Sequence, residues 1–116
     1  MTAGRRVAVV GIGVVACAGT GLDAYWEGLN RAAPEGERRV RDFDPNQWYP
    51  NPKEARRSDR SQQFAMASAR MAMQDAGELT SDPGRSGVIY ATGVGGLATF
   101  EEQVKVYVEK GARRVS

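Results

Sequence analysis

Two apolar runs of strand length constrain the fold of this chain more than any other feature. They cover Arg6–Val15 and Ser86–Ala91, and in neither do apolar and polar residues alternate. Such runs are typical of strands buried on both faces, as in parallel sheets covered by helices. The sequence therefore predicts an α/β fold with the element order β-α-loop-α-β-α. Two strands are too few for such a sheet to stand alone, which implies either partner chains or further sequence.

Helical spacing and capping residues predict the remaining elements. The predicted helices are residues 22–30, a short start at 51–54, 59–76 and 97–110, and the predicted turns and loops are 16–21, 32–50 and 81–84. Thr20 can cap the first helix, and Asn51 the second. Alanines form a stripe on the helix at 59–76, which indicates close approach to another backbone. Gly77 and Gly111 mark helix ends.

Composition excludes several classes of chemistry. The chain has 116 residues, 16 basic and 14 acidic, for a net charge of +2, with one Cys and no His. It therefore holds no intrachain disulfide, no Ser-His-Asp or Cys-His catalytic group and no Cys/His zinc site. We expect neither a metal nor a cofactor. The length allows one domain at most.

The N-terminus resembles an export signal, because Arg5 and Arg6 precede an apolar run. Valines and glycines dominate that run, however, which favours a buried strand. No apolar stretch approaches the roughly 18 residues that span a bilayer. We therefore expect a cytoplasmic protein with no membrane partner, in which the thiol stays reduced.

Glycines near the start of the chain leave two interpretations open. Gly11, Gly13 and Ala16 match the G-x-G-x-x-G/A pattern, which predicts a dinucleotide-binding domain if a helix begins within it. No helical signal follows at once, and no acidic residue ends a second strand about twenty residues on. The alternative is that these glycines allow a helix or strand to pack closely.

Two further features have both a functional and a structural interpretation. The glycines of residues 93–96 follow the second predicted strand, where α/β sheets place their sites. They predict either an anion or substrate site or a tight turn into the next helix. Cys17 is predicted to be a small structural thiol, because the chain contains no His to act as its base.

Basic residues gather at two places in the chain. Lys53, Arg56, Arg57 and Arg60 lie around one helix start, and Arg113 with Arg114 follows the last helix. They are either solvated surface charges or a surface for an acidic partner, because arginine grips carboxylate and phosphate groups bidentately. Nearby Glu54 and Asp59 and the lack of interleaved aromatics argue against nucleic acid.

Taken together, these segments resemble the N-terminal part of the β-ketoacyl-acyl carrier protein synthases. These are condensing enzymes of fatty acid and polyketide synthesis. The resemblance rests on five runs: residues 5–15, Trp26–Leu29, Lys53–Arg60, the alanine-rich helix to Gly77, and Ala91–Leu97 with Glu101-Glu102. The runs follow in the right order over nearly the whole chain.

The resemblance implies a partial thiolase-like fold, a homodimer and acyl carrier protein as partner. Residue by residue, it implies a carrier-protein surface at Lys53, Arg56, Arg57, Arg113 and Arg114. It implies that Val94 lines the acyl-chain pocket near the dimer interface. The implied reaction is decarboxylative condensation of an acyl thioester with malonyl carrier protein.

Two departures from the family pattern are visible. The loop at residues 32–50 is shorter than usual, and the family's nucleophilic Cys and its His residues lie beyond Ser116. Cys17 does not match that nucleophile. We therefore expect an inactive N-terminal portion of a synthase, and the alternatives are a small dinucleotide-binding domain or a non-catalytic carrier-protein-binding module.

Overall fold

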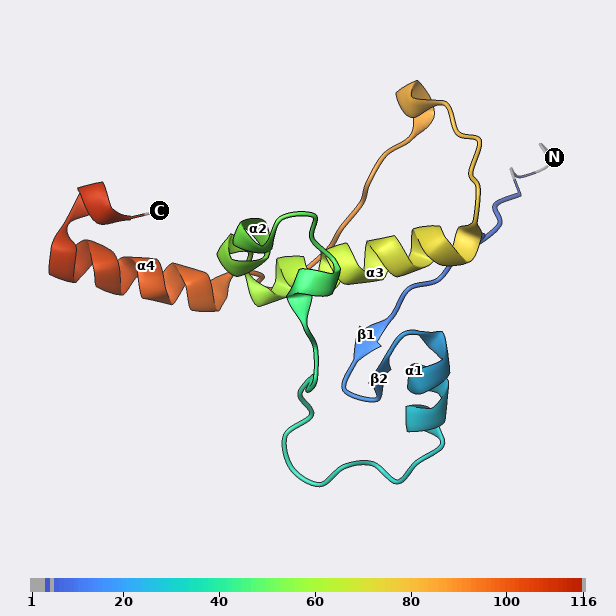
Figure 1. Ribbon diagram of the computed structural model, residues 1–116, viewed down its shortest axis with the longest axis horizontal. Helices are drawn as coiled ribbons and strands as arrows, with labels where there is room; N and C mark the ends of the chain where they lie inside the picture. Colours follow the sequence, from blue (N-terminus) through green and yellow to red (C-terminus); the bar gives the residue numbers. More distant parts are fainter. Residues whose placement is uncertain (1–3, 5, 116) are drawn as a thin grey trace. The chain divides into compact units, whose positions relative to one another are not determined.

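A computed structural model describes residue 4 and residues 6–115 (Figure 1). They divide into two compact units: residues 4 and 6–44 with 67–87, and residues 45–66 with 88–115. The helices are α1 (Leu22–Leu29), α2 (Pro52–Arg57), α3 (Arg60–Ala76) and α4 (Leu97–Lys110), and the strands are β1 (Val15–Ala16) and β2 (Gly19–Thr20). Arg5, which contributes to the family resemblance, lies outside the described residues, as does Ser116.

The first unit contains a short hairpin followed by α1. Strands β1 and β2 pair antiparallel, with Val15 opposite Thr20, so the predicted turn at 16–21 is a tight hairpin. Helix α1 follows as predicted. The predicted Thr20 cap is wrong, because Gly21 (φ 87°) precedes α1 and no side chain caps it.

The predicted strand Arg6–Val15 is wrong except at its last residue. Residues 6–14 form no strand, and part of this segment lies against the C-terminal half of α3. A Cβ atom on Gly11 would lie 2.8 Å from the Cβ of Ala76, and one on Gly13 would lie 2.7 Å from the Ala72 nitrogen. The Ile12 N–H also donates to a carboxylate oxygen of Asp75 at 2.9 Å. The alanine stripe of α3 therefore receives a glycine-containing backbone, as its composition predicts.

The second unit contains α2, the start of α3, and α4. The Asn51 side chain accepts a hydrogen bond from the Lys53 N–H at 2.9 Å, and Pro52 occupies the first turn of α2, as predicted. Helix α4 has its predicted bounds, between Gly96 (φ 82°) and Gly111 (φ 80°). Both glycines adopt the positive φ that other residues avoid.

The predicted strand Ser86–Ala91 is also wrong. A 3-10 turn at Pro83–Arg85 is capped by Asp82, and residues 86–91 then form no strand. Val88 and Ile89 are 94% and 101% exposed. A strand forms only where its backbone pairs with a neighbour, and the described residues supply none for this segment.

The described residues therefore form a mixed, α-rich structure with a small two-stranded sheet, and the predicted parallel sheet is not formed. Among them, only Ala55 and Ala67 are fully buried apolar residues. The apolar face of α4 stays exposed, including Phe100 at 66% and Val108 at 76%. Apolar burial accordingly stabilises these elements little.

Candidate functional site

The predicted basic surface begins on α2. Lys53, Arg56 and Arg57 all lie on this helix with exposed side chains. None of the three forms an ion pair with a described residue, and so their charges are available to an acidic partner. Arg60 differs, because its guanidinium lies over the ring of Phe64, 4.7 Å from the ring centroid.

A shallow hollow lies beside this end of α2, within the second unit. Its lining residues come from the end of α2 and from the first two turns of α4: Arg56, Arg57, Ser58, Thr99, Glu102 and Gln103. Two arginines and one glutamate give its rim a net positive charge. An anionic group of a partner is attracted to such a rim, which steers and orients its approach.

Arg113 and Arg114 lie elsewhere on the second unit. They belong to a 3-10 turn, Ala112–Arg114, that follows the C-terminal end of α4, and both are exposed. Helix α4 is about 21 Å long at 1.5 Å per residue. The structure therefore places the two basic groups toward opposite ends of α4, and any shared partner must span that helix.

The glycine-rich loop of residues 92–96 leads directly into α4. Gly96 is the N-cap residue of the helix, in a left-handed conformation that suits the predicted tight turn. Val94 is 73% exposed. The side chain that the resemblance assigns to an acyl pocket is therefore available for contact in the described structure.

Asp59 makes contacts that sequence reasoning missed. One carboxylate oxygen accepts hydrogen bonds from the backbone and the hydroxyl of Ser61, both at 2.9 Å. The other accepts from the Thr99 hydroxyl of α4 at 2.8 Å. The Ser61 backbone bond, the Thr99 bond and the Ser61 hydroxyl bond lower the pKa of Asp59, and the Gly96 backbone adds to this.

A local signal could have identified Asp59 as a capping residue. The Gln62 side chain accepts from the Asp59 N–H at 3.0 Å, which completes a reciprocal capping box at the start of α3. The spacing of Asp59 and Gln62 is visible in the sequence. The bond to Thr99, forty residues away, has no local signal.

The dinucleotide interpretation of Gly11, Gly13 and Ala16 does not fit the structure. The space beside both glycines is occupied by the backbone of α3, and Ala16 belongs to β1. Helix α1 begins only at Leu22, so no helix N-terminus faces these glycines. They serve close packing, which was the alternative interpretation.

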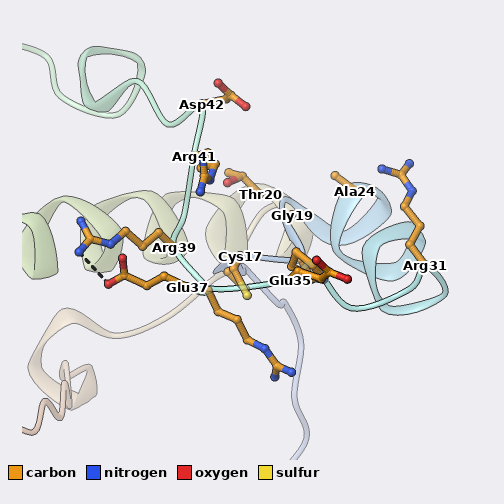
Figure 2. Close-up of a pocket in the computed structure, with 14 residues that line it drawn as sticks. Cys17, Gly19, Thr20, Ala24, Arg31, Glu35, Glu37, Arg39, Arg41 and Asp42 are labelled. Carbon is orange, nitrogen blue, oxygen red and sulfur yellow. Dashed lines mark ion pairs between the residues drawn. The ribbon is translucent and has the colours of Figure 1, made fainter.

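Cys17 lies at the turn between β1 and β2, beside a hollow of about 490 Å³ in the first unit (Figure 2). The sequence predicts a small structural thiol here, but Cys17 is exposed and does not fit that prediction. Arg39, which lines the hollow, forms an ion pair with Glu37 at 2.7 Å. The hydrogen bond to Glu37 and the negative charge of Glu37 raise the pKa of Arg39. Arg31 pairs with Glu27 at 2.9 Å. Part of the positive charge around Cys17 is therefore already neutralised.

Two kinds of feature are absent from the described residues. No helix among them is both long enough and apolar enough to cross a membrane. Residues 4 and 6–115 also contain no group of three or more His, Cys, Asp or Glu that could hold a metal ion.

Comparison with known proteins gives consistent matches. The family described as "Beta-ketoacyl synthase, N-terminal domain" matches residues 30–116. A 3-oxoacyl-[acyl-carrier-protein] synthase 2 of Synechocystis is 35% identical over 133 aligned residues, which cover 97% of this chain and 31% of the relative. Its counterpart in Staphylococcus aureus is 32% identical, covering 100% and 32%. A polyketide β-ketoacyl synthase of Streptomyces cyaneus is 38% identical, covering 94% and 30%.

These alignments also bear on length. The chain spans about a third of the relatives it matches. The 133 aligned positions exceed the 116 residues of the chain, so the Synechocystis relative carries insertions within the aligned region. Because the family match covers residues 30–116, three quarters of the sequence, the chain belongs to the β-ketoacyl synthase family.

Proposed function

We propose that this chain is the N-terminal portion of a β-ketoacyl-acyl carrier protein synthase. The observation that carries the proposal is the family match over residues 30–116, together with relatives named as 3-oxoacyl and polyketide synthases. The substrates are an acyl thioester and malonyl-acyl carrier protein, in fatty acid or polyketide synthesis.

The proposed reaction has two stages. A cysteine thiolate takes the acyl group from its thioester, which releases the carrier thiol. The malonyl thioester then loses CO₂, and its carbanion attacks the acyl carbon and frees the cysteine, giving a 3-oxoacyl thioester. Positioned hydrogen-bond donors stabilise the enolate and the oxyanion. By resemblance, a cysteine and His residues outside this chain perform these steps.

We propose that the chain by itself does not catalyse condensation. It contains no His, and its one cysteine, Cys17, lies at a hairpin turn without a base of that kind. Incubation with acyl- and malonyl-carrier protein should give no 3-oxoacyl product by mass spectrometry. Turnover well above the background rate would contradict this proposal.

The proposed role of this portion in docking rests on its exposed basic residues. Arg56 and Arg57 at the hollow, with Lys53 on the same helix, are free to pair with an acidic carrier protein. Arg113 and Arg114 form a second basic group beyond α4. A partner that contacts both groups lies along α4.

Val94 is proposed to line the path of the acyl chain. Its β-branched side chain is 73% exposed on the loop before α4. A residue of this size admits a flexible acyl chain but narrows its path. We also propose a homodimer, which offers the exposed apolar face of α4 a partner, and a cytoplasmic location, where Cys17 stays reduced.

Charge reversal tests the docking proposal. Arg56→Glu with Arg57→Glu should weaken binding of acyl carrier protein at least tenfold in calorimetry at low salt, because two attractions become repulsions. Arg70→Glu is the matched control, since Arg70 is an exposed arginine of α3 outside the basic groups. Equal affinity of the double variant and the control would overturn the docking proposal. Binding without condensation by the complete protein would favour a non-catalytic carrier-binding module.

A further inference from the structure

The first turn of α3 contacts the chain at three points around the glycine-rich loop of residues 92–96. Before the loop, the Tyr90 hydroxyl donates to the Ser61 carbonyl oxygen at 3.1 Å. Within it, a Cβ atom on Gly95 would lie 3.1 Å from the Ser61 hydroxyl oxygen. After it, the Thr99 hydroxyl donates to Asp59 at 2.8 Å. One short stretch of α3 thus fixes both ends of the loop.

These polar contacts have little help from apolar packing. The residues from 92 to 95 are all exposed, and Val94 is 73% exposed. Leu97, in the first turn of α4, is also 58% exposed. Because no buried side chain holds this loop among the described residues, its place relative to α3 depends on hydrogen bonds.

Asp59 is the centre of this arrangement. It is partly buried and uses both carboxylate oxygens, one toward Ser61 in the helix that it caps and one toward Thr99 in α4. Hydrogen bonds to an ionised acceptor are about twice as strong as neutral ones. The same carboxylate therefore starts α3 and holds the first turn of α4.

We propose that Asp59 is a positioning residue that, through Thr99, fixes the loop carrying Val94 against the start of α3. The assignment of Val94 to an acyl-chain path rests on the proposed function, whereas the positioning itself does not. In a synthase, such a fixed loop keeps the width of that path constant during turnover.

Amide hydrogen exchange on the full chain tests the positioning. Thr99→Val removes the donor at nearly constant volume, and Thr99→Ser retains it. We expect exchange at the Phe100 amide, which donates to the Gly96 carbonyl oxygen, and in the turn of α4 after it to become about tenfold faster in Thr99→Val and to stay within twofold of the parent in Thr99→Ser. Exchange in the first unit, at Ala72 and Met73 of α3, should not change.

A variant at Asp59 gives an independent check. Asp59→Asn keeps an oxygen that can cap α3 but removes the charge, so exchange at the Phe100 amide should become faster while the rest of α3 stays protected. Unchanged exchange at Phe100 and in the following turn of α4 in both Thr99→Val and Asp59→Asn would overturn the proposal. A uniform rise throughout the chain would overturn it as well, because that indicates a general loss of stability.

The two proposals fail in different experiments. If exchange responds as expected but charge reversal at Arg56 and Arg57 leaves carrier binding intact, the positioning role stands and the docking proposal fails. If carrier binding weakens but exchange at Phe100 is unaffected, the docking proposal stands and the positioning role fails.

Discussion

Two segments that each overlap one of the predicted strands are held in different ways. Residues 11–13, the glycine-packed segment, lie directly against the backbone of α3, with no space for a Cβ atom on Gly11 or Gly13. Residues 88–99, the hydrogen-bonded segment, are held to the start of α3 by the side chains of Tyr90 and Thr99. Gly93 in this second segment has open space around it.

The difference shows that an apolar run alone does not specify how a segment is held. Close backbone packing tolerates no added atom, because interiors are dense and carbonyl groups cannot move aside. Hydrogen bonds tolerate bulk nearby but depend on particular donors and acceptors. The two segments should therefore respond to opposite kinds of substitution.

The largest expected effect comes from adding a side chain to the glycine-packed segment. Gly13→Val places atoms where the Ser68 carbonyl and the Ala72 nitrogen lie. We expect the free energy of unfolding to fall by about 3 kcal/mol, measured by urea denaturation. Gly93→Val, in open space, should change it by less than about 0.5 kcal/mol. Equal losses in the two variants would remove the distinction between the segments.

A smaller effect is expected from removing the carboxylate that each segment uses. Asp59→Ala removes the cap of α3 and the hydrogen bond to Thr99, and it should lower the free energy of unfolding by about 1.5 kcal/mol. Asp75→Ala removes one bond, from the Ile12 N–H, and should cost about 0.5 kcal/mol because the glycine packing remains. Urea denaturation of both variants measures these two losses of unfolding free energy. A larger loss for Asp75→Ala than for Asp59→Ala would contradict the expected difference between the segments.

Acid should weaken the hydrogen-bonded segment selectively. The pKa of Asp59 is lowered from 3.8, chiefly by the Ser61 and Thr99 hydrogen bonds, so its contribution is complete above the unfolded pKa and is lost as pH falls through the lower folded value. The stability difference between the parent and Asp59→Ala should therefore be constant from pH 5 to 7 and should narrow below about pH 4. For Gly13→Val the difference from the parent should keep its size over the same range. A pH-independent difference for Asp59→Ala would contradict the ionised acceptor.

The smallest effect is expected on the surface of α4, beyond the hydrogen-bonded segment. Lys105 pairs with Glu101 at 2.9 Å, but both side chains are about two-thirds exposed (65% and 67%). Lys105→Ala should change stability by less than about 0.5 kcal/mol, and less again in 0.5 M salt. A loss equal to that of Asp59→Ala would mean that surface charge, rather than the Asp59 bond, holds this region.

Residues at the helix ends were enough to predict the helices. The strands could not be predicted in this way, because they depend on contacts between residues distant in sequence. Asn51 with Pro52 and the glycine at position 111 mark helix ends within one or two residues of their observed places. Strand formation depends on partners distant in sequence, so Val88 and Ile89 carry strand-forming side chains without a strand.

The candidate site shows the same division. The sequence identified Arg56 and Arg57, and their helical start placed them on an exposed surface as expected. It also placed Arg113 after the last helix, as observed, but it could not show that the first two turns of that helix line the hollow beside α2. Nor could it pair Asp59 with Thr99, forty residues apart.

The exposed stretch at residues 86–91 has a consequence for handling the protein. It is uncharged, contains no proline and carries β-branched and aromatic side chains, and residues 87–91 of it pair with no strand among the described residues. Segments of this kind stack between molecules into cross-β assemblies when they stay uncovered. Arg85 provides the one flanking charge within two residues of this stretch. The chain at high concentration should therefore form fibrils that bind thioflavin T, and the substitution Val88→Lys should delay their appearance.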